Sequence, residues 1–361
     1  MPRTIKNLWP LLVQWDHLCL AYQRCRKRKR FKSGAVEFEF DWEFNLKQIQ
    51  QELTSGRWEP GAYYNFRITD PKPRLISAAP FRDRVVHHAV VGILEPILDP
   101  KFIFDSYACR RGKGTHRALK RAEYFARRHP WCLKTDIVKF FPNIDHAILM
   151  QIFARRIRDP RLLQLIVKIV DSGVGVLASE QLPQWFPGDD LFDTLRPRGL
   201  PIGNLTSQFF ANLFLDPIDQ FVKEELCVPG YVRYADDLVV FGDSKQELWD
   251  YRERITEKLN GLRLKLHPNK TMVVKSAHGI EFLGFKIFPN RIRLSQRSCR
   301  RLARRCRQWA WEFKHGQKSY QQIVDGMQSW IAHSNQANAY AIRKQIFSRL
   351  RLSRSNTRRR N

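Results

Sequence analysis

Two short runs rich in β-branched and aromatic residues, 231–234 and 238–241, flank the adjacent acids Asp236 and Asp237. Two such runs joined by a tight polar turn predict a β-hairpin with the acids at its tip. Paired carboxylates repel each other unless a cation neutralises them, and Mg²⁺ favours carboxylate oxygens together with substrate phosphates. Most Asp-Asp dipeptides are solvated turns, but the apolar flanks of this pair favour a metal site.

The rest of the chain combines helical periodicity with short apolar runs. Apolar spacing predicts helices at residues 8–22, 40–55, 81–94, 112–127, 160–174, 208–225 and 244–260, another beginning at 143–145, and mostly helix from 295 to about 350. Strands are expected at 58–68, 71–76, 131–141, 262–266 and 281–287, and the segment 177–198 is expected to be irregular. The helix at 81–94 should end near Pro96, because the residue before a proline avoids the helical region. The absence of a βαβ period favours an α+β sheet-and-helix domain followed by a helical one.

The charge of the chain indicates its partner class. Lys and Arg number 63 against 35 Asp and Glu, which gives a formal net charge of +28. A surplus of this size favours a phosphate backbone as ligand, and the basic run 24–32 is expected to contact phosphates. The alternative is a basic ribosome- or membrane-associated protein. We expect no membrane partner, because no run approaches the roughly 20 apolar residues of a membrane span.

Several other residues with reactive or charged side chains have ordinary explanations. The seven cysteines show no Cys-x-x-Cys spacing, which predicts free thiols and a cytoplasmic location. Asp145 lies where a helix is expected to begin and is predicted to be its N-cap. The second acidic pair, Asp189-Asp190, lacks flanking strands and is predicted to lie in a solvated loop.

A third acid, Asp136, lies in an apolar run, where a buried carboxylate needs a partner. Together with Asp236 and Asp237 it would complete a two-metal site suited to phosphoryl transfer. Phe140 and Phe141 follow closely enough to form a wall of the same pocket. The alternative explanation is that Asp136 pairs with a Lys or Arg in the core.

Four blocks of the chain resemble, in the same order, the sequence blocks of reverse transcriptases. They are Asp136 with Phe140-Phe141, Tyr234-Ala235-Asp236-Asp237, Leu266-His267-Pro268-Asn269-Lys270 and Phe282-Leu283-Gly284-Phe285. The resemblance begins earlier, at Lys72 and Arg74, and covers about residues 58–287. It implies an α+β right-hand polymerase, whose fingers and palm consist of antiparallel sheet plus helices and are followed by an α-helical thumb. The implied divisions are an N-terminal helical and basic extension at 1–57, fingers at 58–130, a palm at 131–290 with an insertion near 177–198, and the thumb and basic tail at 291–361.

The resemblance also implies roles for individual residues. Two Mg²⁺ ions, for which Mn²⁺ can substitute, would be held by Asp136, Asp236, Asp237 and the carbonyl of Ile137. The catalytic set would also include Lys270, near the leaving group, and Phe141 would be the gate that selects dNTPs. The remaining implied contacts are Lys72, Arg74, Ile202, Gly203, Gln208 and Tyr234 with substrate, and Phe282, Leu283 and Gly284 as the primer grip.

One block departs from the common pattern. Most bacterial reverse transcriptases carry Gln-Gly-x-x-x-Ser-Pro, where this chain has Ile202 at the first position and Gln208 at the last. These two replacements resemble reverse transcriptases of diversity-generating retroelements. That resemblance implies adenine-directed mutagenic copying of a template-repeat RNA from a DNA or RNA primer, with a small basic oligomeric accessory protein. The alternatives are a retron or group II intron-type enzyme of ordinary fidelity, or a non-catalytic RNA-binding scaffold derived from a polymerase.

Overall fold

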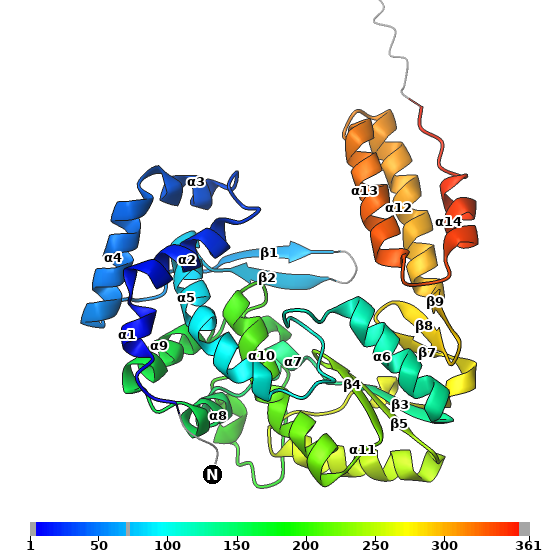
Figure 1. Ribbon diagram of the computed structural model, residues 1–361, viewed down its shortest axis with the longest axis horizontal. Helices are drawn as coiled ribbons and strands as arrows, with labels where there is room; N and C mark the ends of the chain where they lie inside the picture. The colour runs from blue at the N-terminus through cyan, green and yellow to red at the C-terminus, as the bar shows by residue number, and fades with distance from the viewer. Residues whose placement is uncertain (1–4, 70–72, 354–361) are drawn as a thin grey trace, which may run out of the picture.

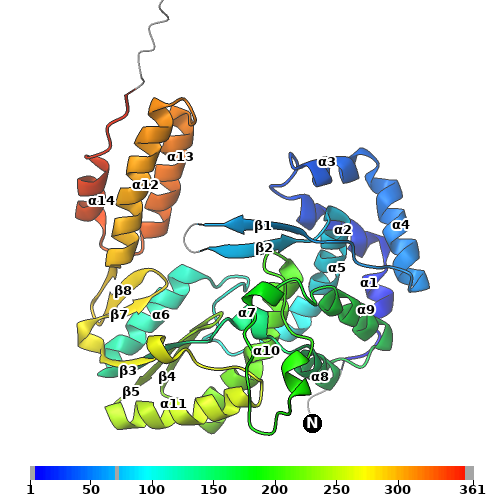
Figure 2. The ribbon, with the colours of Figure 1, turned by 180° about the vertical axis from the view of Figure 1, so that it is seen from behind.

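The protein is described by a computed structural model that covers residues 5–69 and 73–353, so Lys72 lies outside the described residues. Helices and antiparallel sheets are mixed along the chain, as predicted for the α+β class. Figures 1 and 2 show a central sheet with two raised parts, the N-terminal helices on one side and the C-terminal helices on the other. Within the described residues, no helix is both long and apolar enough to cross a membrane.

The N-terminal part is helical and packs on the long helix α5. Its helices are α1 (Trp9–Leu12), α2 (Trp15–Arg26), α3 (Ser33–Phe40), α4 (Trp42–Ser55) and α5 (Phe81–Leu98). The single helix predicted at 8–22 is therefore wrong, because the chain becomes extended at Gln14 between α1 and α2. The carbonyl of Val13 leaves the helical ladder and accepts a hydrogen bond from Gln50 of α4 at 2.8 Å.

The predicted end of α5 near Pro96 is also wrong. Proline removes one backbone donor and crowds the carbonyl four residues earlier, which usually ends or kinks a helix. Here the helix continues to Leu98 with Pro96 inside it. Leu94 and Leu98 are fully buried in the main core, so packing of the last turn outweighs the lost hydrogen bond.

A two-stranded hairpin projects from this helical part. It consists of β1 (Tyr64–Ile68) and β2 (Arg74–Ala78), which pair antiparallel, so the strand expected from residue 58 begins six residues later. Figures 1 and 2 show the hairpin extending toward helix α12 (Gln296–Lys314) of the C-terminal part. Thr69, at the end of β1, lines a cavity together with Arg301 and Arg304 of α12.

The central sheet has the strand order β4-β5-β3-β6 and is antiparallel throughout. Its strands are β3 (Trp131–Asp136), β4 (Gly230–Tyr234), β5 (Asp237–Gly242) and β6 (Met272–Lys275). Helices α10 (Leu205–Gln220) and α11 (Lys245–Asn260) connect the strands and share one hydrophobic core with Leu133 and Val240. Alternate side chains such as Cys132 and Val239 face the opposite side, where α6 (Thr115–Arg128) and the β7–β9 sheet form a second core.

Several short elements complete this region. Between β3 and α10 lie α7 (Phe140–Asn143), α8 (His146–Arg156) and α9 (Pro160–Asp171), and the segment 177–198 is irregular, as predicted, apart from two short 3₁₀ turns. The strand predicted at 131–141 ends at Asp136, because Lys139 takes a left-handed conformation and α7 begins. The strand predicted at 262–266 is wrong: Leu266 makes only an isolated bridge with Ile137. The helix predicted at 244–260 is confirmed as α11, and its first turn is fixed by a capping box in which the Ser244 and Glu247 side chains bond each other's backbone.

The two aspartates of the predicted solvated loop differ from each other. The prediction that Asp189 is solvated is wrong, because its side chain is only 3% exposed. It forms ion pairs with Arg196 at 3.4 Å and with Arg263 at 3.2 Å. Asp190 is exposed and accepts backbone hydrogen bonds from the following turn. The prediction that Asp145 is the N-cap of α8 is confirmed. Its carboxylate also forms an ion pair with Arg196 at 2.9 Å. The segment 177–198 is thus held to the sheet region by ion pairs.

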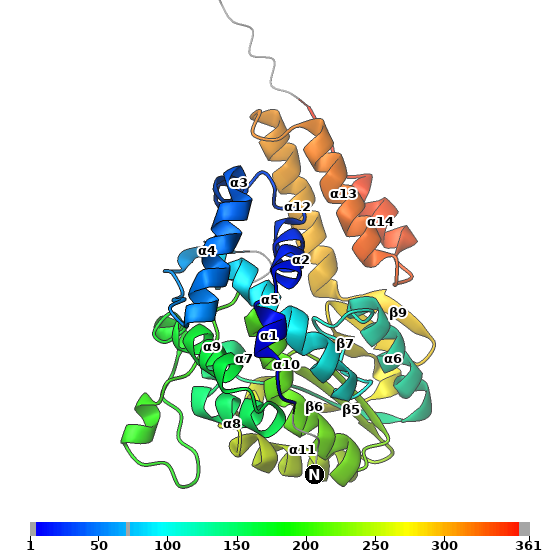
Figure 3. The ribbon, with the colours of Figure 1, turned by 60° about the vertical axis from the view of Figure 1, so that its left-hand side comes forward.

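The C-terminal part begins with a three-stranded sheet and ends with three helices. Its elements are β7 (Ile280–Phe282), β8 (Phe285–Phe288), β9 (Arg291–Leu294), α12 (Gln296–Lys314), α13 (Tyr320–Ser334) and α14 (Tyr340–Phe347). The helices predicted after residue 295 are confirmed, and Figure 3 shows α12 and α13 rising above the β7–β9 sheet and α6. Leu302, Cys306 and Trp309 of α12 are buried with Ile323 of α13 in a small core of their own.

That core depends on a glycine in α13. A Cβ atom at Gly326 would lie 2.7 Å from Cζ2 of the buried Trp309, whereas one at Gly34 in α3 would meet only ordinary contacts. Alanine favours a helix by about 1 kcal/mol over glycine, and overpacking a core costs roughly 1–3 kcal/mol. Gly326→Ala should therefore lower the melting temperature, and Gly34→Ala should leave it unchanged or raise it. Equal behaviour of the two variants in thermal denaturation would contradict this packing.

Candidate active site

The hairpin predicted around the acidic pair is confirmed, and it brings the three predicted aspartates to one end of the central sheet. Asp136 ends β3 and lies directly opposite Asp237, the first residue of β5. Asp236 occupies the turn between β4 and β5, after Ala235 with φ of 54°. The backbone N–H of Ile137 donates to the Asp236 carbonyl at 3.2 Å, which joins the turn to β3.

The close approach of these carboxylates changes the acidity of Asp236. Burial of its side chain, followed by the charges of Asp136 and Asp237, raises the pKa of Asp236 from its ordinary value of 3.8 to about 7. Like charges held together in a partly desolvated place disfavour the ionised form. The site therefore favours a bound cation or a proton at this position near neutral pH.

Lys270 supplies one cation. It lies in the 3₁₀ turn Pro268–Lys270, and its ammonium group forms an ion pair with the Asp136 carboxylate. The Asp136 carbonyl accepts from the backbone N–H of His267 at 2.7 Å, which fixes the lysine-bearing turn beside β3. Lys270 was predicted to be a catalytic residue together with the three aspartates. The structure brings its ammonium group into contact with one of them, Asp136.

The donor set suits a hard divalent cation that also binds substrate. Three carboxylates and the carbonyl of Ile137 offer oxygen ligands only, which Mg²⁺ and Mn²⁺ prefer. Within the described residues, no group of three or more His, Cys, Asp or Glu side chains is arranged as a ready-made metal cage. Phosphates of a nucleotide would have to complete the coordination.

Phe141 lies in α7, five residues after Asp136 and one residue after the buried Phe140. The centroids of the two rings are 5.4 Å apart, and the rings meet edge to face. The Phe141 carbonyl accepts from the backbone N–H of Leu200 at 2.9 Å, which ties α7 to the segment before Ile202. Phe141 itself is half-buried, so part of its ring is free to contact a ligand.

The segment 202–208, which differs from the common Gln-Gly-x-x-x-Ser-Pro pattern, lies against the β1–β2 hairpin. The Ile202 carbonyl accepts from the N–H of Ser77 at 2.8 Å, and Asn204 bonds the Ser77 carbonyl at 2.9 Å. Gly203 has φ of 122°, and a Cβ atom there would lie 2.9 Å from Cγ2 of Ile76. Because any side chain at position 203 would clash with Ile76, only glycine fits there. This explains the glycine at the second position of the Gln-Gly-x-x-x-Ser-Pro pattern.

The other predicted substrate contacts are spread around this region. Arg74 begins β2 with an exposed side chain, and Gln208 is exposed in the first turn of α10. Tyr234 ends β4 beside the acidic turn, and its hydroxyl oxygen accepts from Thr115 at 3.2 Å. The structure thus shows Tyr234 near the aspartates and Arg74 on the strand that contacts Ile202.

The predicted primer grip is a tight turn between β7 and β8. Leu283 and Gly284 both have positive φ, 51° and 86°, which is the pattern of a type I′ hairpin turn. The Gly284 carbonyl accepts from the Ser298 hydroxyl at 2.7 Å, so the turn is fixed to the start of α12. Phe282 is buried below it. Movement of α12 would therefore move this turn.

One face of α12 is rich in arginine. A cavity beside its first three turns is lined by the residues Glu281, Gln296, Arg297, Arg300, Arg301, Arg304 and Arg307. Arginine guanidinium groups bind phosphate oxygens without reading base sequence, so this face suits a nucleic-acid backbone.

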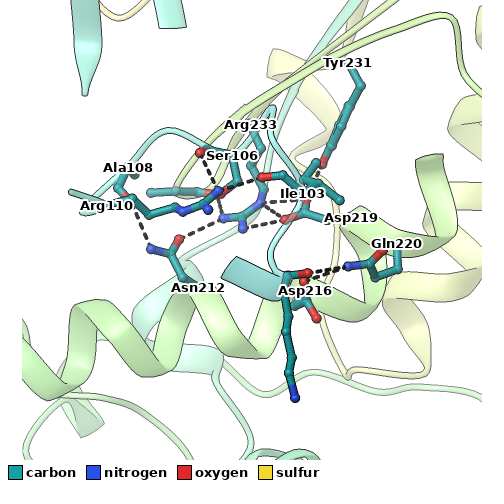
Figure 4. Close-up of polar contacts among 12 residues, drawn as sticks. Ile103, Ser106, Ala108, Arg110, Asn212, Asp216, Asp219, Gln220, Tyr231 and Arg233 are labelled. Atoms are coloured by element: carbon teal, nitrogen blue, oxygen red, sulfur yellow. Dashed lines mark hydrogen bonds and ion pairs between the residues drawn. The ribbon is translucent and has the colours of Figure 1, made fainter. Parts of the chain in front are cut away.

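Sequence reasoning missed a buried polar cluster behind the acidic turn. Arg233 of β4 and Asp219 of α10 are both fully buried and form a salt bridge at 2.6 Å (Figure 4). An arginine within an apolar strand directly before the Asp pair was a usable signal, because a buried guanidinium requires a carboxylate partner. A second signal was the acids Asp216 and Asp219 on an otherwise apolar helix.

The sequence of the chain is similar to a family model and to several known proteins. The family model described as "Reverse transcriptase (RNA-dependent DNA polymerase)" matches residues 69–287, more than half of the 361-residue chain. Protein YkfC of Escherichia coli (strain K12) is 24% identical over 294 residues, covering 70% of this chain and 73% of that protein. Group II intron-encoded protein LtrA of Lactococcus lactis subsp. cremoris is 25% identical over 352 residues, covering 78% and 56%. The putative COX1/OXI3 intron 1 protein of Saccharomyces cerevisiae is 23% identical, covering 78% and 39%.

The chain thus spans nearly three quarters of the first relative and about half or less of the two intron-encoded ones. The matched residues 69–287 include all three aspartates, Phe141, Lys270 and the segment 202–208. The order of these blocks, the convergence of the three aspartates and Lys270 at one end of an antiparallel sheet, and the extent of the family match lead to one conclusion. The chain belongs to the reverse transcriptase family, the RNA-dependent DNA polymerases, and is related to the group II intron-encoded members.

Proposed function

We propose that this RNA-directed DNA polymerase copies a template-repeat RNA into cDNA and misincorporates at adenines, so that a target gene is diversified. The observation that carries the proposal is Ile202 at the first position of its block, with Gln208 at the last. Its substrates would be dNTPs, an RNA template and a DNA or RNA primer, and a small basic oligomeric accessory protein would be its partner.

The arrangement of parts supports a right-hand polymerase. We assign residues 1–57 to a helical and basic extension, 58–130 to the fingers, 131–290 to the palm and 291–361 to the thumb and tail. The β1–β2 hairpin extends toward the arginine-rich face of α12, as fingers and thumb would on either side of a duplex. The three aspartates lie at one end of the central sheet.

Reverse transcriptases use divalent metal ions such as Mg²⁺, and the oxygen-only donor set fits them. We assign the two ions to Asp136, Asp236, Asp237 and the carbonyl of Ile137. When bound, such ions lower the pKa of the primer 3′-hydroxyl and neutralise charge on the pyrophosphate. Lys270, which forms an ion pair with Asp136, would keep an ammonium donor close to the leaving group.

The geometry around Ile202 suggests how fidelity is lowered. Its backbone is fixed by Ser77 on β2, whose first residue, Arg74, we assign to the incoming triphosphate. A side chain at position 202 that cannot hydrogen-bond must distinguish correct from incorrect nucleotides by shape alone. Such discrimination contributes a free-energy difference on the order of 1–3 kcal/mol between the two nucleotides. Gly203 and Gln208 would contact the same nucleotide, and Phe282, Leu283 and Gly284 the primer end.

A second candidate is a group II intron-type enzyme of ordinary fidelity. It is favoured by the 25% identity with the intron-encoded protein LtrA over 78% of this chain. A non-catalytic RNA-binding scaffold is less favoured, because the three aspartates, Phe141 and Lys270 are all present. Error measurements distinguish the two polymerases, and primer extension tests the scaffold.

Asp236→Asn should reduce dNTP incorporation to background while RNA affinity stays close to wild type. The matched control Asp190→Asn changes an exposed loop acid in the same way and should retain full activity. Primer extension with Mg²⁺ and filter binding of the RNA provide the two measurements. Incorporation by Asp236→Asn at the wild-type rate would contradict the assignment of the three aspartates.

The same variant should be more stable than wild type when metal is removed with EDTA. The raised pKa of Asp236, about 7, means that the folded state holds the proton more tightly than the unfolded chain. The stability from this proton is lost as pH rises through 7, so Asp236→Asn should gain on the order of 1–2 kcal/mol at pH 8. The gain should shrink between pH 8 and pH 5, and a pH-independent difference in thermal melts would contradict this origin.

Phe141→Ala should raise the use of rNTPs relative to dNTPs. The half-buried ring of Phe141, five residues after Asp136, would lie under the sugar and exclude a 2′-hydroxyl, and alanine removes that wall. Phe192→Ala, in the exposed part of the segment 177–198, is the control and should leave the ratio unchanged. An unchanged ratio for Phe141→Ala in single-nucleotide extension would show that another residue is the gate.

Ile202→Gln should lower misincorporation at template adenine more than at the other bases. Glutamine restores a side chain that can hydrogen-bond to the incoming nucleotide, and Arg74→Ala should also alter the error spectrum. Val36→Gln, on an exposed face of α3, is the matched control. Sequencing of cDNA from a defined RNA measures the spectra. A wild type as accurate at adenine as elsewhere would favour the ordinary-fidelity enzyme.

A further inference from the structure

A fully buried ion pair lies directly behind the turn that carries Asp236. The guanidinium of Arg233 donates from Nε to both carboxylate oxygens of Asp219, at 2.8 and 2.9 Å, and from Nη2 at 2.6 Å (Figure 4). Neither side chain is exposed. A buried guanidinium is stable only with a well-oriented partner, so the position of Arg233 is set by Asp219 and hence by α10.

One guanidinium nitrogen reaches the acidic turn itself. Nη1 of Arg233 donates to the Ala235 carbonyl at 3.2 Å and to the Asn212 side-chain oxygen at 3.2 Å. Ala235 has φ of 54°, a left-handed conformation that costs a non-glycine residue roughly 1–2 kcal/mol. The accepting carbonyl belongs to the peptide that joins Ala235 to Asp236. Arg233 therefore holds the strained peptide from which the Asp236 side chain projects.

The cluster is also fixed from its outer side. The Tyr231 hydroxyl donates to Asp219 at 2.9 Å, and Asn212 donates to the Ala108 carbonyl at 2.8 Å. The backbone of Arg233 accepts from the N–H of Tyr107 at 3.0 Å. Three separate segments thus determine where the guanidinium lies, and little freedom is left to it.

We propose that Arg233, held by Asp219, is a positioning residue that orients the Asp236–Asp237 turn for binding of the divalent cation. This inference rests on the proposed assignment of the three aspartates to the metal ions. Arg233 is fully buried, so it acts through the turn and not on the substrate. Groups that orient metal ligands in this way typically change metal affinity or activity about 10- to 100-fold when they are altered.

The chain offers a matched control on the same helix. Asp216, three residues before Asp219, is also fully buried and pairs with Arg156. Its hydrogen bonds run to Arg156 and Gln220, away from the acidic turn. Asp216→Asn therefore removes a buried charge from α10 while leaving every hydrogen bond of Arg233 and Ala235 in place.

The experiment measures Mn²⁺ binding by electron paramagnetic resonance and the Mg²⁺ dependence of primer extension on the full chain. Arg233→Lys keeps the charge but cannot contact Asp219 and the Ala235 carbonyl together. It should weaken Mn²⁺ binding about 10-fold or more and raise the Mg²⁺ concentration for half-maximal rate by a similar factor. RNA affinity should stay unchanged, and Asp216→Asn should lower only the melting temperature.

Tyr231→Phe serves as a second variant, because it removes one hydrogen bond to Asp219 without changing any charge. It should shift metal binding in the same direction by a smaller factor, and it decides the question if Arg233→Lys does not fold. Folded variants that bind Mn²⁺ like wild type, or an equal shift in Asp216→Asn, would overturn the positioning role. A wild-type chain that neither binds Mn²⁺ nor extends primers would instead contradict the proposed function itself.

Discussion

The pairing of β3 with β5, in the register that sets Asp136 opposite Asp237, is the constraint on which the rest of the structure depends. A shift of one residue would turn every side chain of β3 to the other face and separate the acids. The correct register instead concentrates negative charge, which is why the pKa of Asp236 rises to about 7 through burial and its two acidic neighbours. The surrounding fold must hold this unfavourable cluster in place while leaving it accessible to a ligand.

Two hydrophobic cores on opposite faces of the sheet provide the rigidity. Leu133 and Val240 join α10 and α11 on one face, and Cys132 and Val239 join α6 and the β7–β9 sheet on the other. The turn at 282–284 is fixed to α12 through Ser298, so the C-terminal helices are linked to the second core. The acids therefore lie at the edge of a rigid block, while the parts that would contact a duplex extend away from it.

Local sequence signals predicted the elements that local interactions determine. The capping box at Ser244 and the hairpin around Asp236 depend on residues close in sequence, so both could be recognised from the chain alone. The continuation of α5 through Pro96 could not, because its last turn is stabilised by packing against distant residues. Asp189 shows the same limit, because it is buried by Arg263, a partner far along the chain that spacing does not reveal. Arg233 could be recognised as a charge in an apolar strand, but spacing alone does not identify Asp219 as its partner.

The contacts of the segment 202–208 explain how the residue at position 202 can change without loss of the fold. Ile202 is fixed through its carbonyl, which accepts from Ser77, and Gly203 is required by its close approach to Ile76. These interactions involve backbone atoms and the absence of a side chain, so none depends on the identity of residue 202. Asn204 completes the attachment to β2. A glutamine or an isoleucine can therefore occupy the same place beside the hairpin, because these contacts do not dictate the choice between the two side chains.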